Sequence, residues 1–386
     1  MKRGLRLPSS CKLVARHKYK LTINMYKLSL IMTALCLVFA CNSDTVKDFE
    51  IVEGLVLESP PPYNQQYGIT SSLVGGEGDV ESIVGYNSAQ HSLDVFSVKE
   101  RKKNSISFER EGPEVVDEIR FIQYVSKDSI FIASRNVLLI VNSHGDVVYR
   151  YSIKLNWGKD SKAVLPEFYQ PYFVGDGGVQ AFFNKEDGEF YFKLNYHKYP
   201  RFVSKESYQE DVVLFASLNL VSKDVKALGI RYPEKMRNTM YGGLSKIHCE
   251  MDDGVIYYGF QGFPEIYRFE LSTGETKMFG EFSKSNEPAV YLAGDDLLEH
   301  LLKYTHYLDI RINKHKGVIY RFINVPNDKG RHDLVLQEYS LTDYRLVSEG
   351  FFPKWRSLFG VMMAKKGMYV PIMDGEEDEL AYAFIK

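Results

Sequence analysis

The stretch Ser129–Ile153, SIFIASRNVLLIVNSHGDVVYRYSI, decides the fold class of this chain. It predicts one strand over Ser129–Ala133, a second over Val137–Val141 and a third over Val147–Ile153. The turn between the last two strands is Asn142–Asp146, where Gly145 supplies the positive φ that such a hairpin often needs. The stretch therefore predicts a meander of antiparallel strands.

The run Val137–Val141 is apolar at five consecutive positions. A sheet with one wet face would alternate apolar and polar residues, so a continuous run indicates burial on both faces. Stacked propeller blades bury their inner strands in this way, and parallel sheets do so too. Parallel strands need helical crossovers, and the lack of helical stretches between these strands argues against them.

Similar strand pairs recur along the chain at intervals of about 40 to 70 residues, near the size of a four-stranded propeller blade. Aromatic residues make up 14% of the sequence, with 27 Tyr and 24 Phe, which also favours strands. The expected pairs are Ser82–Tyr86 with Ser92–Val98, Val213–Leu220 with Val225–Ile230, Glu265–Leu271 with Glu275–Phe282, Asp309–Ile312 with Val318–Val325, and Leu334–Leu341 with Tyr344–Phe352.

The predicted fold is all-β, a single propeller over residues 51–386. Six blades of about 55 residues fit this length, and seven smaller blades also fit. The last run, Leu380–Ile385, needs a partner strand, and Ile51–Leu57 can supply it and close the ring. One helical insertion is expected near 295–308, where Asp295 can act as the cap and apolar residues recur at helical spacing.

The amino-terminal segment has the pattern of a secretory signal. A basic start, Met25-Tyr26-Lys27, precedes the apolar run Leu28–Ala40, which is shorter than the roughly 20 residues of a membrane span. Val38-Phe39-Ala40-Cys41 resembles the lipobox of bacterial lipoproteins, in which the cysteine sulfur receives lipid and cleavage occurs before it. We therefore expect a signal peptide over residues 1–40 with translation starting at Met25, lipidation at Cys41, and a polar tether over 41–50.

Removal of residues 1–40 changes the charge of the chain. These residues hold eight Lys and Arg and no acid, which leaves 40 basic and 50 acidic residues, a net charge of −10. An acidic domain of this kind is a poor candidate for binding nucleic acid. The mature cysteines are Cys41 and Cys249, so lipidation of the first leaves no intrachain disulfide, and Cys249 is expected to be a small buried residue.

Two segments carry a family resemblance. Glu109–Val116, followed by Ile119-Arg120-Phe121 and Asp128–Ile132, resembles the start of a blade in uncharacterised TolB-like six-bladed β-propeller lipoproteins of the bacterial envelope. Asp309–Ile312 with Val318–Phe322 is similar to the same group. The resemblance implies the fold and the membrane anchor, and it brings no activity and no catalytic residue.

The sequence shows neither a nucleophile elbow nor a phosphate-binding glycine loop, and no metal or cofactor is expected. The acidic run Asp374–Glu379 lacks the ligand spacing of a calcium loop and is interpreted as a solvated turn. Aromatic, Arg and His residues near strand ends are the candidate ligand-binding residues, because such side chains stack on sugars or peptides and clamp anions. They are Tyr169, Tyr172, Tyr241, His248, Arg268 and Arg321.

The interpretation that these aromatic residues only pack one blade against the next stays open. The predicted function is that of a membrane-anchored, monomeric envelope lipoprotein, on the outer membrane at its periplasmic or surface face. Its propeller is expected to bind a glycan, a peptide or an envelope protein. The alternative is an envelope hydrolase or lyase that acts on a glycan or peptide at the centre of the propeller.

Overall fold

The computed structural model describes 47–49, 51–58, 70–75, 78–111, 115–116, 119–155, 169–173, 181–196, 212–237, 246–283, 303–327, 329, 331–352, 361–372 and 379–386. All of these residues belong to one compact unit, Lys47–Lys386. The expected signal peptide and Cys41 lie outside the described residues, as do Tyr241 and the acidic run up to Asp378.

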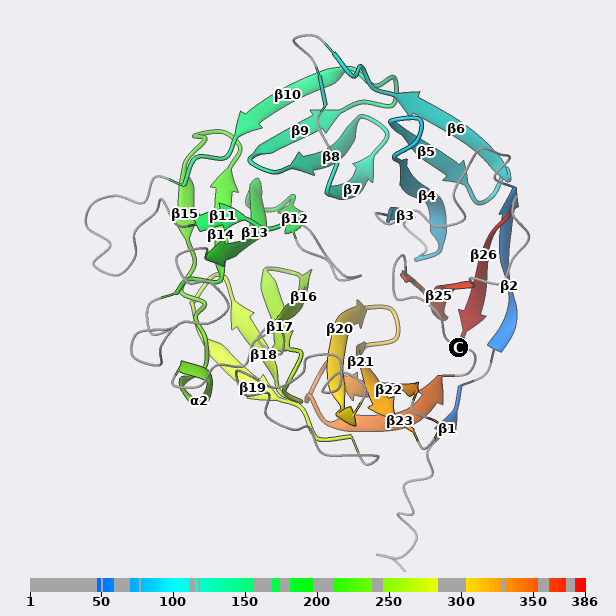
Figure 1. The fold of residues 1–386 in the computed structure, drawn as a ribbon, viewed down its shortest axis with the longest axis vertical. Coiled ribbons are helices and arrows are strands. Elements are labelled where there is room, and N and C mark those ends of the chain that lie inside the picture. Colours follow the sequence, from blue (N-terminus) through cyan, green and yellow to red (C-terminus); the bar gives the residue numbers. More distant parts are fainter. Residues whose placement is uncertain are drawn as a thin grey trace, which may run out of the picture. The chain divides into compact units, whose positions relative to one another are not determined.

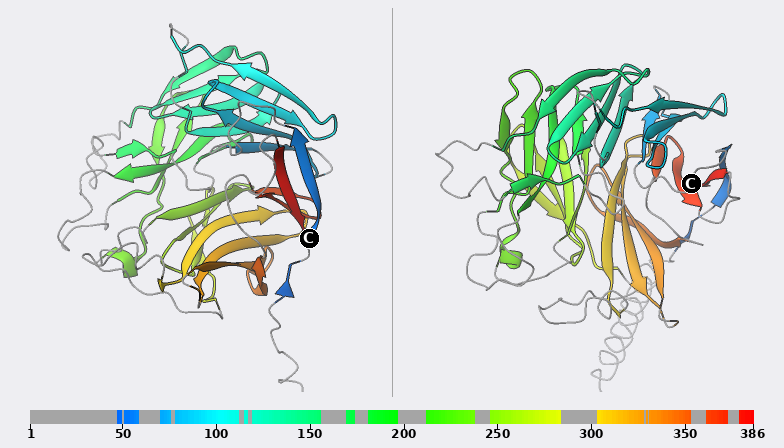
Figure 2. Two further views of the ribbon diagram at one scale, coloured as in Figure 1. Left: turned by 45° about the vertical axis from the view of Figure 1, so that its right-hand side comes forward. Right: turned by 45° about the horizontal axis from the view of Figure 1, so that its top comes forward.

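The described strands form six sheets, arranged as blades around a common centre (Figure 1). In blades I to IV the first strand lies innermost and the last strand lies at the rim (Figure 1), and Figure 2 gives two further views of the same blades. Blade I comprises β3 (Thr70–Val74), β4 (Val80–Asn87), β5 (Ser92–Ser97) and β6 (Lys102–Ser107). Blade II comprises β7 (Phe121–Ser126), β8 (Ser129–Ser134), β9 (Val137–Val141) and β10 (Val147–Ser152).

Blade III comprises β11 (Tyr169–Pro171) and β12 (Ala181–Asn184), which both pair with β13 (Glu189–Tyr196), and then β14 (Phe215–Asn219) and β15 (Val225–Ala227). The short helix α2 (Glu234–Arg237) follows it. Blade IV comprises β16 (Ile247–Asp252), β17 (Val255–Phe260), β18 (Ile266–Glu270) and β19 (Thr276–Phe279).

Blade V comprises β20 (His306–Asn313), β21 (Val318–Pro326), β22 (His332–Ser340) and β23 (Leu346–Phe352), with β1 (Lys47–Asp48) parallel to β23. Blade VI comprises β24 (Met362–Ala364), β25 (Gly367–Ile372) and β26 (Glu379–Ile385), with β2 (Ile51–Glu58) at its rim. The all-β prediction with six blades is therefore confirmed, and the expected hairpins all fall within these sheets.

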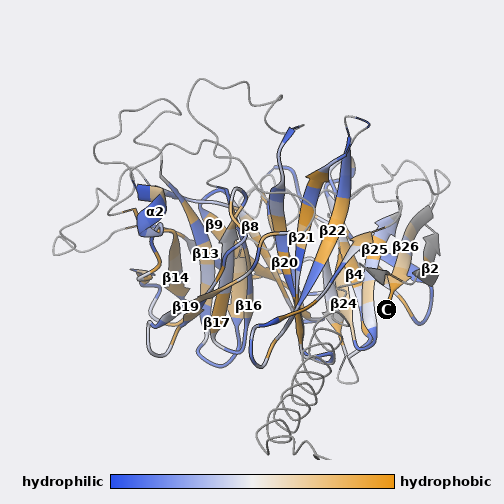
Figure 3. Cartoon of the chain, turned by 90° about the horizontal axis from the view of Figure 1, so that it is seen from below, coloured by the Kyte–Doolittle hydropathy of each residue, from blue (hydrophilic) through white to orange (hydrophobic). Residues whose placement is uncertain are grey.

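The core lies between the blades, as the continuous apolar runs predicted. Along β9, Leu138 and Ile140 pack in a cluster shared with blade III, while Leu139 and Val141 pack in a cluster shared with blade I. All four are at most 7% exposed. Strands β21, β22 and β26 also carry hydrophobic residues, which are coloured orange in Figure 3. Burial on both faces of a blade explains why these strands do not alternate.

The ring closes by the predicted pairing of the two ends of the chain. Strand β2 runs antiparallel to β26, with Ile51 opposite Ile385 and Leu57 opposite Leu380. Four of the blades are each built from one continuous segment, and blade V only adds β1 to such a segment. Blade VI joins strands from opposite ends of the chain, and β2 thereby covers the outer edge of β26.

Polar contacts connect every pair of neighbouring blades near their innermost strands. From blade I onward they are Tyr124 N to Ser71 Oγ (3.0 Å), Phe183 N to Gln123 Oε1 (2.6 Å), Lys193 Nζ to Ile247 O (2.9 Å), His248 Nδ1 to Asp309 Oδ1 (2.8 Å), Asn313 Nδ2 to Ala364 O (2.8 Å) and Lys365 N to Gly78 O (2.7 Å). The blades are therefore fixed to one another by directional bonds as well as by apolar packing.

Two boundaries differ from the expectation. The compact unit begins at Lys47, because β1 at the end of the expected tether pairs with β23. The helix expected near 295–308 is wrong at its end, since His306–Leu308 lie in β20. Leu308 packs against the cluster between blades V and VI, so an apolar spacing that suits a helix here serves a buried strand. Residues 295–302 lie outside the described residues.

Closure of the ring predicts a large cost for Leu55→Ala. Leu55 on β2 is 8% exposed and packs in a cluster with Met362 and Tyr382. The truncation should lower the free energy of unfolding by about 2–4 kcal/mol, measured by urea denaturation. The control Val221→Ala, at a side chain that is 89% exposed, should cost less than about 0.5 kcal/mol. Equal effects of the two variants would contradict the assigned role of β2.

Candidate functional site

The innermost strands of blades IV and V carry polar residues at every second position. On β16 these are His248, Glu250 and Asp252, and they alternate with Ile247, Cys249 and Met251. Because side chains alternate across a strand, the three polar residues share one face.

Strand β20 and the turn after it supply the partners of these residues. His248 bonds Asp309, Arg311 Nη1 donates to Glu250 Oε2 at 2.9 Å, and Lys314 Nζ pairs with Asp252. We call these three pairs the inner ladder.

A β-bulge places Asp309 for this contact. The register between β20 and β21 shifts between Tyr307 and Ile310, so Leu308 and Asp309 together oppose Phe322. A bulge of this kind turns the extra side chain away from its regular direction. Asp309 is 1% exposed, and its second oxygen, Oδ2, lies 3.6 Å from Arg311 Nη2. The bulge therefore lets one carboxylate face both His248 and Arg311.

The protonation state of His248 follows from its surroundings. Burial lowers the pKa of His248 to about 4, against the opposing effect of Asp309. Burial acts to raise the pKa of Asp309, but the hydrogen bond from His248 and the charge of Arg311 outweigh it and the pKa is lowered. At neutral pH Asp309 is therefore ionised and His248 is neutral. Nδ1–H of His248 then donates to Asp309, and Nε2 keeps its lone pair.

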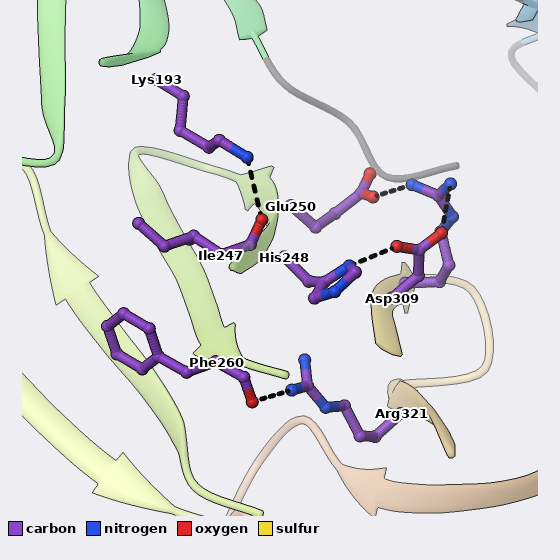
Figure 4. Close-up of polar contacts among 8 residues, drawn as sticks. Lys193, Ile247, His248, Glu250, Phe260, Asp309 and Arg321 are labelled. Atoms are coloured by element: carbon purple, nitrogen blue, oxygen red, sulfur yellow. Dashed lines mark hydrogen bonds and ion pairs between the residues drawn. The ribbon is translucent and has the colours of Figure 1, made fainter. Parts of the chain in front are cut away.

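Blade III contributes a buried ammonium group to the same region. Lys193 on β13 is 3% exposed, and its Nζ donates to Ile247 O at 2.9 Å (Figure 4). The same Nζ lies 4.7 Å from the centre of the Tyr172 ring. Burial lowers the pKa of Lys193 to about 8, so the group stays mostly charged at neutral pH. Lys193 is held by a carbonyl and an aromatic face, neither of which carries a negative charge.

Arg321 on β21 is fully buried between blades IV and V. Its Nη2 donates to Phe260 O at 3.2 Å, and its guanidinium lies 5.9 Å from the centre of the Tyr307 ring. Gly259 makes room for it, since a Cβ there would lie 2.9 Å from Nη2 and 3.0 Å from Nη1. Within the described chain, Nε and Nη1 of Arg321 have no hydrogen-bond partner.

We define the inner cluster as Lys193, His248, Glu250, Asp309, Arg311 and Arg321, which come from β13, β16, β20 and β21. Figure 4 labels Lys193, His248, Glu250, Asp309 and Arg321 between these blades, and Arg311 joins them through its bond to Glu250. Three of the members are cations and two are carboxylates, so the cluster carries one surplus positive charge when His248 is neutral. This local charge is opposite in sign to the net charge of −2 of the full chain.

The structure brings together part of the predicted set. His248 and Arg321 lie in the inner cluster, and Tyr172 lies beside Lys193. Tyr169 is 4% exposed and accepts a hydrogen bond from Val213 N at 3.0 Å, which is a packing role within blade III. Arg268 lies on β18, two strands from the innermost strand, and pairs with Glu270 at 2.5 Å. Cys41 and Tyr241 lie outside the described residues.

Sequence reasoning missed Lys193, Glu250, Asp309 and Arg311. The signal that could have found the last three is the alternation of charged and apolar residues in IHCEMD and LDIRIN, in strands otherwise apolar. Lys193 follows the same rule within the aromatic strand EFYFKLNY. A charge flanked by apolar residues in an inner strand indicates a group buried for a specific contact.

The described residues also include a cysteine thiol, that of Cys249. Cys249 is fully buried, and burial raises the pKa of its thiol to about 12, so the prediction of an inert packing residue is supported. Within the described ranges, no three His, Cys, Asp or Glu side chains are grouped as a metal ion requires. In the same part of the chain, no helix has the length and apolarity needed to cross a membrane.

The buried His248–Asp309 pair predicts a specific dependence of stability on pH. Because the pKa of His248 is lower in the folded chain than its ordinary 6.5, the unfolded chain takes up the proton first as the pH falls. Stability should decline between about pH 6.5 and 4, with a loss of about 2 kcal/mol at pH 5. His248→Asn keeps a donor for Asp309 and should remove this decline, as measured by urea denaturation at pH 7 and 5. His144→Asn, at an exposed histidine, should retain it, and an unchanged decline in His248→Asn would disprove the assignment.

Comparison with solved structures supports the fold. A member of the DUF4221 family from Bacteroides vulgatus ATCC 8482 superposes with a TM-score of 0.71 at 15% identity, over 89% of this chain and 99% of that one. A protein from Bacteroides fragilis NCTC 9343, described as exported, gives a TM-score of 0.53 at 12% identity, over 89% and 96%. At these identities the likeness concerns the fold alone.

Comparison of the sequence gives the family. A search of curated proteins finds no match. The family described as domain of unknown function (DUF4221) matches residues 63–344, almost three-quarters of the chain. The match runs from before blade I into blade V and includes every residue of the inner cluster. The chain therefore belongs to the DUF4221 family of six-bladed β-propellers.

Proposed function

We propose that this chain is a lipid-anchored protein of the bacterial envelope whose propeller binds a ligand at the inner cluster. The resemblance of Val38–Cys41 to a lipobox supports the anchor, as does the resemblance of later segments to TolB-like lipoproteins. The relative from Bacteroides fragilis is described as exported, which agrees with a location outside the cytoplasm. The ligand would be a glycan, a peptide or part of an envelope protein.

The observation that carries the binding proposal is Arg321. A fully buried guanidinium with two nitrogens lacking a partner in the described chain is costly, because burial of an uncompensated charge costs several kcal/mol. Packing of two blades does not need such a group, as the apolar contacts between the other blades show. A ligand that accepts hydrogen bonds from Arg321 would offset this cost.

A second candidate function is catalysis by an envelope hydrolase or lyase. The favouring observation is the His248–Asp309 pair, in which a carboxylate orients an imidazole and leaves Nε2 able to accept a proton. Lowering of the His248 pKa to about 4 makes it a weak base at neutral pH, which favours binding over catalysis. Turnover of a bound compound that is lost in His248→Asn would reverse this preference.

The anchor is tested by Cys41→Ala. The variant should lose labelling by a fatty-acid probe in cells and move from the membrane fraction to the soluble fraction, because the thiol that would carry the lipid is gone. Cys249→Ala should retain both the label and the membrane fraction, since that thiol is buried in the propeller. Labelling that persists in Cys41→Ala would refute the anchor.

The binding site is tested by thermal shift of the purified full chain against a panel of acidic, neutral and basic sugars, amino acids and dipeptides. At least one compound should raise the melting temperature in a saturable manner, because ligands that bind the folded state stabilise it. Arg321→Lys, which loses the planar fork, should reduce that shift. Lys314→Asn removes only the exposed end of the inner ladder and should keep it. Equal shifts in both variants would place the ligand elsewhere.

A further inference from the structure

His248 and Arg321 offer complementary hydrogen-bonding atoms that the described chain leaves unpaired. Nε2 of His248 is buried without a partner, and the Nδ1–H bond to Asp309 makes it an acceptor. Nε and Nη1 of Arg321 are buried donors without a partner. One acceptor and two donors therefore remain in a region where both residues are at most 2% exposed.

The two side chains are neighbours in the structure. Arg321 pairs across the sheet with Ile310, the residue after Asp309, and Asp309 in turn holds His248. The positive charge of Arg321 also acts to lower the pKa of His248. Figure 4 shows the His248 ring with Asp309 on one side and the Arg321 guanidinium below it. A single small molecule can therefore contact both.

The charged side chains around His248 and Arg321 determine which charge the ligand should carry. The carboxylates that act on Arg321 are Asp309, already shared by His248 and Arg311, and Glu265, already paired with Lys235. Lys193 adds a further buried cation whose described contacts are a carbonyl and an aromatic ring. A metal cation at His248 Nε2 would be repelled by Arg321 and Lys246, both of which lower the pKa of His248. An anionic ligand is favoured.

We propose that the inner cluster binds a hydroxycarboxylate, with the carboxylate on Arg321 and a hydroxyl group that donates to His248 Nε2. This proposal rests on the proposed binding function and names its ligand class. A guanidinium fork matches the geometry of a carboxylate, and Lys193 adds attraction for the same charge. A hydroxyl can donate to a neutral imidazole and adds no charge to an anion that carries it. Sugar acids and small hydroxy acids both belong to this class.

The proposal is tested by calorimetric titration of the purified full chain with matched probes. D-glucuronate is compared with D-glucose, which lacks the carboxylate, and with cyclohexanecarboxylate, which lacks the hydroxyls. L-lactate is compared in the same way with 1,2-propanediol, which lacks the carboxylate, and with propionate, which lacks the hydroxyl. Inorganic sulfate tests whether negative charge alone is enough for binding. Because the site is buried, the interval between injections is long enough for each addition to reach equilibrium. At least one of the two hydroxycarboxylates should bind about 10-fold more tightly than both of its partners and than sulfate.

Two variants separate the two contacts. His248→Asn keeps a donor for Asp309 but lacks Nε2, so it should weaken the hydroxycarboxylate about 10-fold and leave the matched carboxylate without hydroxyls unchanged. Arg321→Lys should weaken both carboxylates about 10-fold. Lys314→Asn is the control and should change neither. The melting temperature of each variant without ligand reports whether it is folded.

Each remaining outcome overturns a defined part of the argument. A neutral probe or sulfate that binds as tightly as the hydroxycarboxylates, with loss in Arg321→Lys, overturns the ligand class and keeps the binding site. Binding that neither variant alters overturns the ligand class and the site together. No binding of either hydroxycarboxylate overturns the ligand class. The broader panel described above then decides separately whether the inner cluster binds a ligand at all.

Discussion

The antiparallel pairing of β2 with β26 is the contact on which the rest of this propeller depends. A blade is covered on both faces only if the blades on each side of it are present, so an open ring would expose the apolar faces of blades VI and I. Joining the two ends of the chain in one blade removes that exposure and leaves β26 paired along both of its edges. The apolar runs of the inner strands are stable only within this closed arrangement, because each of their two faces belongs to a different interface.

Closure brings the innermost strands together, and there the chain uses polar contacts. At the interface of blades I and II, and again at that of blades II and III, one side chain accepts a hydrogen bond from a backbone N–H. Blades IV and V are instead joined by the three pairs of the inner ladder. A buried ion pair such as Arg311–Glu250 gains little net stability, because desolvation offsets the attraction, but it penalises any other register. The ladder is therefore best understood as a device that fixes blade V against blade IV and so sets the positions of Asp309 and Arg311.

Arg321 differs from the ladder in a way that bears on function. Every ladder residue meets an opposite charge or a hydrogen-bonding side chain, while Arg321 meets a carbonyl, an aromatic ring and the space that Gly259 leaves. The chain therefore buries a cation whose compensation is incomplete, beside a neutral histidine oriented by Asp309. Groups of this kind concentrate at binding and catalytic sites, where a ligand completes the set. An acidic chain with a positive centre can also discriminate among ligands by charge.

The sequence by itself determined the strands, the stacked blades and the closing pair, because these follow from local pattern. Val137–Val141 required two covered faces, Gly145 required a turn, and Leu380–Ile385 required a partner that Ile51–Leu57 could supply. It misplaced Leu308, since apolar spacing in a short segment suits a helix and a buried strand alike. It named His248 and Arg321 but not Lys193, Asp309 or Arg311. Only the tertiary structure decided that these residues meet, because a bulge in β20 and the order of blades III to V bring together positions up to 128 residues apart, Lys193 to Arg321.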